Sequence, residues 1–167
     1  MAAPDVTPEV EIELPGPDAT LRLGEELGCR LQAGDVLALI GELGAGKTCL
    51  ARGVARGLRV EDPGAVASPT YLLVVEHEGV IPMIHVDAYL APKTRAFLAD
   101  GGADWLAERA GVVVVEWADR IANLLPEETL TVRLEPRPDG LPGRRAQLRG
   151  PDRFAWIREL PGAARSG

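Results

Sequence analysis

The chain has 167 residues, 46% of them hydrophobic, which is enough for one domain with a real core. A formal net charge of −7 argues against a surface built to neutralise nucleic-acid phosphates, because such surfaces are normally basic. No apolar run approaches the ~20 residues of a membrane span, and residues 1–5 lack the features of a signal peptide. We therefore predict a cytoplasmic protein with no membrane segment, one domain over residues 1–162 and a disordered tail at 163–167.

The first elements lead into an apolar strand. Residues 10–14 alternate apolar and acidic side chains, which predicts a strand with one solvated face. Leu23, Leu27 and Leu31 then share one face of a predicted helix that ends before Gly34. The two cysteines, Cys29 and Cys49, fall in apolar helical patterns, so we predict buried thiols and no disulfide or metal pair.

A glycine-rich segment at residues 41–48, which we call the phosphate loop, reads Gly-Glu-Leu-Gly-Ala-Gly-Lys-Thr and fits the pattern G-x-x-x-x-G-K-[ST] at every position. The apolar run 36–40 before it predicts a buried parallel strand, and Leu50, Val54 and Leu58 after it predict a helix. Such a loop turns successive backbone N–H groups toward an anion, and the helix N-terminus adds positive partial charge.

The pattern predicts that Lys47 reaches the β- and γ-phosphates of a nucleotide and that the Thr48 hydroxyl binds Mg²⁺. A plain strand-to-helix turn with a chance lysine is the alternative. The nucleotide-binding residues that we predict from the loop are Glu42, Leu43, Gly44, Ala45, Gly46, Lys47 and Thr48.

The middle of the chain predicts further strands beside this loop. Residues 61–70 have turn chemistry without periodicity and predict a functional loop. Runs 71–75 and 80–87 predict an antiparallel hairpin, and residues 88–110 show only weak helical patterns. Residues 112–116 predict a second fully buried strand.

The closing segment predicts a short helix, a hairpin and a last helix. The short helix covers residues 117–125. We expect its first residue, Trp117, to pack in the core, and the alternative is that it signals the bound nucleotide. Residues 130–135 and 145–149 alternate and predict the hairpin, and residues 152–160 predict the last helix.

Two acids at the ends of apolar strands are candidates to hold the metal. Glu116 follows four valines and Asp87 ends the run 83–87, and ligands gather at strand ends in open α/β sheets. Either acid could instead be a solvated strand-end charge. Thr70 is a candidate switch residue that senses the γ-phosphate, with a simple turn threonine as the alternative, and we expect His85 to be structural.

Four further motifs occur in a specific order and spacing with the phosphate loop. They are Arg52-Gly53, Ser68-Pro69-Thr70-Tyr71, His85-Val86-Asp87-Ala88-Tyr89 and Val115-Glu116-Trp117. Over roughly residues 14–117 the chain resembles the bacterial TsaE (YjeE-type) P-loop ATPases, which support threonylcarbamoyladenosine (t6A) modification of tRNA.

The resemblance implies an α/β fold: a single P-loop NTPase-type three-layer domain with a mixed parallel and antiparallel central sheet flanked by helices. It implies ATP and Mg²⁺ as ligands, with Lys47, Thr70, Asp87 and Glu116 as catalytic residues and the metal on Thr48 and Glu116. It also implies that Pro15 and Gly143 lie where nucleotide edges pack.

The resemblance further implies TsaD-type threonylcarbamoyl transferase and TsaB-type paralogue as partners, tRNA contact only through that complex, and ATP hydrolysis that resets it. Two alternatives remain open. One is a P-loop kinase acting on a small molecule, which would need an arginine-bearing lid that we do not find. The other is a nucleotide-binding switch module with little turnover. A GTPase is less consistent, because the chain has no Asn-Lys-x-Asp guanine-recognition motif.

Overall fold

A computed structural model describes residues 8–108 and 110–165. In chain order its elements are β1 (Glu9–Leu14), α1 (Pro17–Arg30), β2 (Val36–Ile40), α2 (Lys47–Gly57), η1 (Pro63–Ala65), β3 (Val74–His77), β4 (Met83–Asp87), α3 (Ala91–Phe97), η2 (Leu98–Gly102), α4 (Ala103–Glu108), β5 (Val112–Glu116), η3 (Ala118–Leu124), β6 (Thr129–Pro136), β7 (Arg144–Arg149), η4 (Asp152–Glu159) and β8 (Ala164–Arg165). The four η elements are short 3₁₀ or π helices.

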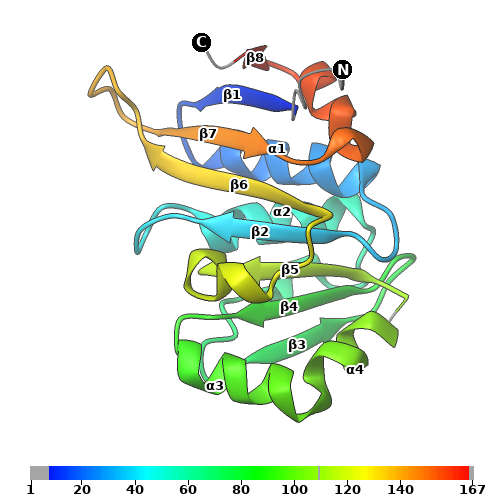
Figure 1. The fold of residues 1–167 in the computed structure, drawn as a ribbon. Coiled ribbons are helices and arrows are strands. Elements are labelled where there is room, and N and C mark those ends of the chain that lie inside the picture. Colours follow the sequence, from blue (N-terminus) through cyan, green and yellow to red (C-terminus); the bar gives the residue numbers. More distant parts are fainter. Residues whose placement is uncertain (1–7, 109, 166–167) are drawn as a thin grey trace, which may run out of the picture.

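The strands form one mixed sheet in the order β3-β4-β5-β2-β6-β7-β1-β8 (Figure 1). The central strands β4, β5, β2 and β6 are parallel, and β3, β7, β1 and β8 join them in antiparallel pairs. This confirms the predicted α/β fold with a mixed sheet. The register pairs Asp87 of β4 with Glu116 of β5, and Glu116 with Leu39 of β2. Both predicted acids therefore lie at the C-terminal ends of parallel strands, where the phosphate loop begins.

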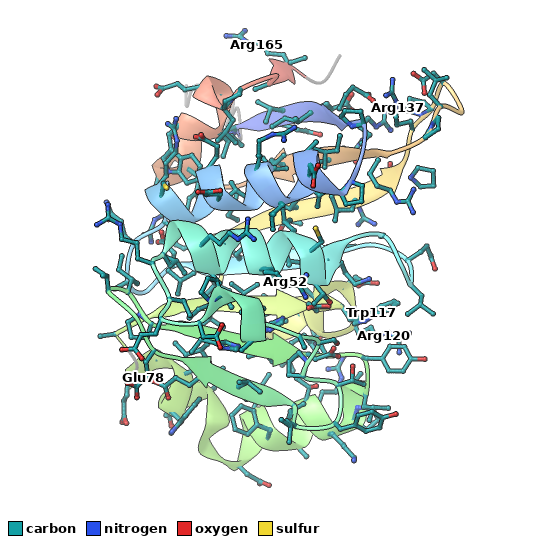
Figure 2. All side chains as sticks on the ribbon, turned by 180° about the vertical axis from the view of Figure 1, so that it is seen from behind. Arg52, Glu78, Trp117, Arg120, Arg137 and Arg165 are labelled. Carbon is teal, nitrogen blue, oxygen red and sulfur yellow. The ribbon has the colours of Figure 1, made fainter. Side chains whose placement is uncertain are left out.

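Helices α1 and α2 cover one face of the sheet, as the view from behind shows (Figure 2). They pack closely because glycines face each other across the contact. A Cβ added at Gly53 of α2 would lie 2.2 Å from the Leu21 carbonyl oxygen and 2.9 Å from Gly24 Cα, and Gly28 and Gly57 make an equally tight pair. The β5 residues Val112 and Val114 complete the core on this side.

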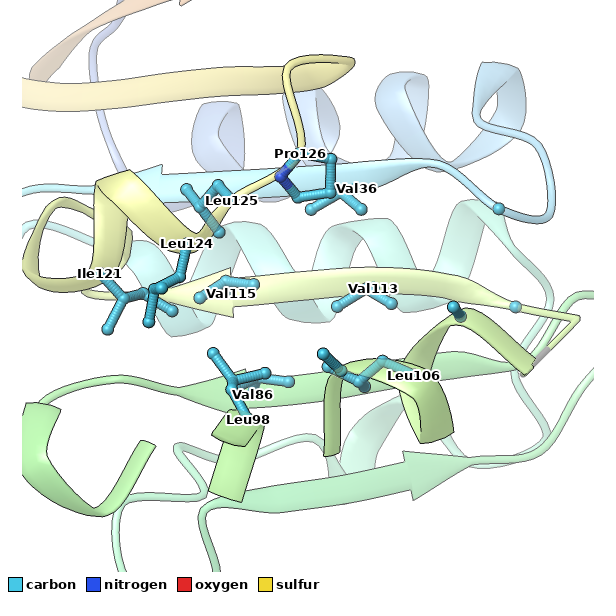
Figure 3. Close-up of a pocket in the computed structure, with 14 residues that line it drawn as sticks. Val36, Val86, Leu98, Leu106, Val113, Val115, Ile121, Leu124, Leu125 and Pro126 are labelled. Carbon is cyan, nitrogen blue, oxygen red and sulfur yellow. The ribbon is translucent and has the colours of Figure 1, made fainter. Parts of the chain in front are cut away.

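The opposite face of β4, β5 and β2 is covered by η2, α4 and η3 (Figure 3). A cavity of about 300 Å³ remains there, and its side chains are aliphatic. Its labelled lining residues are Val36, Val86, Leu98, Leu106, Val113, Val115, Ile121, Leu124, Leu125 and Pro126. The valines of β5 thus alternate between two cores, which confirms the prediction of a strand that is buried on both faces.

Three local predictions differ from the structure. The strand predicted at 71–75 begins only at Val74, because the Leu73 N–H donates to the Pro69 carbonyl and closes a turn in which Leu73 has a φ of 67°. Cys29 is exposed and Cys49 half-buried, although both are free thiols. The thiol of Cys49 lies 3.5 Å from the Pro17 carbonyl oxygen at the start of α1, and the glycines occupy the close helix contact itself.

The tail predicted to be disordered at 163–167 also differs in part. Its residues 164–165 form β8, which pairs with Val10 and Glu11 of β1. Residues 166–167 lie outside the described part of the chain, and so does residue 109 within the weak helical patterns predicted at 88–110. Among the described residues, no helix has the length and apolarity that crossing a membrane requires.

Candidate functional site

The phosphate loop joins β2 to α2 and has the backbone conformation that its glycines predict. Gly44 and Gly46 have φ values of 77° and 105°, which side chains with a Cβ rarely adopt. A Cβ at Gly41 would lie 2.8 Å from the Leu134 carbonyl oxygen, so this glycine is needed for close packing on β6. Helix α2 then starts at Lys47 with its N-terminus at the loop. The loop therefore has the form that binds phosphate at a helix N-terminus.

Lys47 lies inside the loop and is only 5% exposed. Its ammonium donates to the carbonyl oxygens of Gly41 and Glu42 at 2.6 and 2.8 Å. The same Nζ lies 3.8 Å from the centre of the Trp117 ring, a cation–π distance. Burial lowers the pKa of Lys47, and the negative charge of Glu116 is the main influence that opposes this. The cation is thus fixed between the loop and the end of β5.

Glu116 and Thr48 meet at the base of the loop. The Thr48 hydroxyl lies 2.9 and 3.1 Å from the two carboxylate oxygens of Glu116. His85 Nε2 lies 2.8 Å from Oε1 of the same carboxylate. Glu116 is 2% exposed, so the alternative of a solvated strand-end charge is wrong for this residue. The two residues that were predicted to share a metal are in direct contact.

Asp87 makes side-chain hydrogen bonds to the loop at residues 66–70 and not to the phosphate loop. Its Oδ2 accepts from the hydroxyls of Ser68 and Thr70 at 2.7 and 3.0 Å, and its Oδ1 accepts from the Tyr89 N–H. Arg52 of α2 donates to the Val66 carbonyl oxygen and fixes the start of the same loop. Asp87 is buried, so it is not a solvated charge either. Ser68 was missed as a site residue, although its place in the Ser-Pro-Thr motif was the available signal.

Trp117 is partly buried and packs against the core on one side, as predicted, but it also lines the cavity of the site. Its backbone has a φ of 57°, a left-handed conformation that turns the chain directly after β5. The ring contacts Tyr89 edge-on at 5.1 Å between centroids, and the Arg120 guanidinium lies over both rings (Figure 2). Arg120 also donates to the Tyr89 carbonyl oxygen. These contacts make a rigid wall beside Lys47.

Pro15 and Gly143 lie together beside the phosphate loop. A Cβ at Gly143, whose φ is 109°, would meet the backbone of Leu14 and Pro15 at 2.2 to 2.8 Å. The next residue, Arg144, donates to the Gly143 and Gly44 carbonyl oxygens at 2.9 and 3.3 Å. The structure therefore places Pro15 and Gly143 next to each other near the loop, and it adds Arg144, which no motif had indicated.

The site opens into a cavity of about 350 Å³ between the phosphate loop and the 66–70 loop. At its mouth Leu43 is 86% exposed and Tyr71 is 95% exposed. Glu42 and Gly44 are exposed, whereas Ala45 is buried against the core. The residues that line the cavity are Leu43, Gly44, Lys47, Thr48, Ser68, Thr70, Tyr71, Tyr89, Glu116 and Trp117.

The donor set at Thr48 and Glu116 fits Mg²⁺. A hydroxyl and a carboxylate are hard oxygen ligands, and Mg²⁺ is usually held by one or two carboxylates together with substrate phosphates and water. Within residues 8–108 and 110–165, no group of three or more His, Cys, Asp and Glu is arranged to hold a metal ion. The residues present therefore fit a metal that binds together with a nucleotide.

Comparisons with known proteins identify the family to which the chain is similar. The family model for the threonylcarbamoyl adenosine biosynthesis protein TsaE matches residues 14–146. The chain is 42% identical over 136 residues to the tRNA threonylcarbamoyladenosine biosynthesis protein TsaE of Mycobacterium tuberculosis, covering 73% of this chain and 76% of that protein. For the TsaE proteins of Treponema pallidum and Bacillus subtilis the identities are 38% and 37%, covering 72% and 70% of this chain and 87% and 71% of theirs.

Among solved structures, the crystal structure of Bacillus subtilis YdiB superposes with a TM-score of 0.69 at 26% sequence identity. The superposition covers 91% of this chain and 92% of that one, so the two chains share the fold over most of their length. The family match includes every residue that lines the cavity, and also Pro15 and Gly143. The chain therefore belongs to the TsaE family.

Proposed function

We propose that this protein binds and hydrolyses ATP with Mg²⁺ in tRNA t6A modification, and that hydrolysis resets a transferase complex of TsaB- and TsaD-type proteins. The observation that carries the proposal is the 2.9 Å contact between the Thr48 hydroxyl of the phosphate loop and Glu116 at the end of β5. This pairing of a loop hydroxyl with a strand-end acid supplies the metal ligands that phosphoryl transfer from ATP requires. The assignment to tRNA t6A modification rests on the names of the relatives.

In this proposal each part of the site has one task. The loop amides and Lys47 bind the phosphates, and Thr48 and Glu116 hold Mg²⁺, which neutralises charge that develops on them. Asp87 orients Thr70 and Ser68 on the loop that faces the γ-phosphate, and these hydroxyls sense whether that phosphate is present. Trp117 and Tyr89 exclude water from one side. Pro15 and Gly143 pack at the edge of the nucleotide.

The exposed surface around the cavity mouth supports the proposal that the protein binds a protein partner. Four large side chains are exposed there or directly beside it: Leu43, Tyr71, Leu72 and Tyr89. Exposed apolar groups gathered at one place mark interaction sites. A partner that covers them would also cover the nucleotide, so hydrolysis and docking would be linked. With a net charge of −7, the chain is expected to contact tRNA only through that partner complex.

ATP hydrolysis by the purified protein, alone and with TsaB- and TsaD-type proteins of the same organism, tests the function. We expect the protein alone to hydrolyse ATP slowly and the partner complex to stimulate it. The measurement with partners is made both with and without tRNA. Partner-independent phosphate transfer to a small metabolite would instead favour a P-loop kinase. Nucleotide binding with no turnover in any arm would favour a switch module.

Removing the Thr70 hydroxyl tests the switch role. Because Thr70 contacts Asp87 and not the phosphate loop, Thr70→Val should lower ATP turnover by roughly 10-fold or more and leave ADP affinity unchanged. Steady-state hydrolysis and ADP titration measure the two effects. Thr129→Val, which also removes a hydroxyl but lies on β6 outside the site, is the matched control. Equal turnover in the two variants would refute the role.

A further inference from the structure

His85 is a buried polar residue to which the proposed function assigns no role. It lies in the centre of β4, a strand whose five residues are all buried, and its side chain is 0% exposed. A buried polar side chain costs stability unless hydrogen bonds replace those it made to water. The contacts of its two ring nitrogens therefore indicate why a histidine stands there.

The two nitrogens of His85 differ. Nε2 lies 2.8 Å from Glu116 Oε1, whereas Nδ1 is buried and has no hydrogen-bond partner among the described residues. The neighbouring His77 ring, 6.3 Å away between centroids, also has an unpartnered buried nitrogen, so it does not satisfy Nδ1. A histidine kept only for packing would be expected to have both nitrogens satisfied. The contact to Glu116 is thus the polar interaction that accounts for His85.

The Glu116 carboxylate is held from two sides. An ionised carboxylate only accepts hydrogen bonds, so His85 Nε2 carries the hydrogen and donates to Oε1. Thr48 donates from the phosphate loop to Oε1 and Oε2 at 2.9 and 3.1 Å. If Thr48 turns to a metal ion, His85 remains as the side-chain donor that keeps the buried carboxylate oriented. Residues that orient metal-binding carboxylates in this way typically contribute about 10- to 100-fold to metal affinity.

We propose that His85 is a positioning residue that orients the Glu116 carboxylate for Mg²⁺. This inference rests on the proposed function, because it assigns the metal to Thr48 and Glu116. The side chain of His85 hydrogen-bonds to Glu116, and within the described part of the chain it has no hydrogen bond to the loop amides or to Lys47. Nucleotide binding without metal should therefore not depend on His85.

The test compares His85→Leu with His85→Gln, whose amide nitrogen can donate where Nε2 does. Mn²⁺ binding to the ADP complex, followed by electron paramagnetic resonance, reports the metal, and ADP titration in EDTA reports the nucleotide site. We expect His85→Leu to weaken Mn²⁺ binding about 10- to 100-fold, to leave ADP affinity in EDTA within about 2-fold, and His85→Gln to recover most of the metal affinity.

Three outcomes would overturn the proposal. His85→Leu with wild-type Mn²⁺ affinity would show that the contact does not orient the carboxylate. Equal losses of Mn²⁺ and ADP affinity in both variants would indicate a general structural role. If His85→Leu does not fold, His85→Gln still tests the proposal. A folded His85→Gln variant that binds Mn²⁺ as weakly as a Glu116→Gln variant does would refute the donor role. Failure of the proposed function is distinguishable, because wild-type protein would then show no Mn²⁺ binding with ADP at all.

Discussion

Glu116→Gln is expected to abolish ATP hydrolysis while ATP binding persists. The substitution keeps the shape of a side chain that is 2% exposed, but it removes the negative charge that faces Thr48. A metal ion supplies several kcal/mol of transition-state stabilisation in phosphoryl transfer, so its loss should slow turnover by roughly 100-fold or more. The loop amides and Lys47 remain, and they bind the phosphates independently of the carboxylate. Steady-state hydrolysis and ATP titration in EDTA separate the two effects.

Glu127→Gln is the matched control, because Glu127 is an exposed glutamate just before β6 and lies outside the cavity. It removes the same charge from the chain and should leave turnover unchanged. Wild-type turnover in Glu116→Gln would show that the residue does not hold the metal. Loss of ATP binding in EDTA would show instead that the variant had damaged the phosphate loop.

Gly53→Ala should be among the most destabilising single-methyl changes in the chain. The added Cβ would lie 2.2 Å from the Leu21 carbonyl oxygen and 2.9 Å from Gly24 Cα, and these are backbone atoms that cannot rotate away. The helices α1 and α2 would have to separate. Overpacking of a close contact typically costs about 1–3 kcal/mol, and a backbone clash lies at the upper end of that range. Urea unfolding measures the loss in the free energy of unfolding.

Gly64→Ala makes the same chemical change where there is room. The atom nearest to its added Cβ is Asp62 Oδ1 at 3.3 Å, which belongs to a side chain and not to the backbone, and Gly64 is exposed. It should change stability by less than about 1 kcal/mol, since alanine also restricts the unfolded chain. Equal stability of the two variants would contradict the close helix contact.

Much of the fold could be predicted because its signals are local. The apolar runs 36–40 and 112–116 became the central parallel strands, and the alternation in 10–14 became β1 with one solvated face. The strand order could not be predicted, because the pairing of β6 with β2 joins segments far apart in the chain. Helix periodicity likewise did not show that Cys29 is exposed, since the glycines and not the leucines set the α1–α2 contact.

The candidate site, like the fold, could be predicted only where local sequence signals specify it. The phosphate loop, Thr48 and Glu116 could be predicted, because a contiguous motif and a strand end fix their positions. The core packing of Trp117 was predicted but its contact with Lys47 was not, since a left-handed backbone turns the ring and no periodicity indicates that turn. Arg144 was missed because it reaches Gly44 from β7, 100 residues further along the chain. Residues that act through tertiary contacts leave no local pattern.

Calorimetric titration of the purified protein with ATP, in excess Mg²⁺ and again in EDTA, tests whether nucleotide and metal bind together at this site. We expect ATP to bind in both conditions and more tightly with Mg²⁺, because Thr48 and Glu116 are proposed to hold the metal beside the phosphates. Lys47→Ala serves as the negative control and should weaken binding in both conditions. Absence of ATP binding at millimolar concentration, or equal affinity with Mg²⁺ and in EDTA, would refute the proposed site.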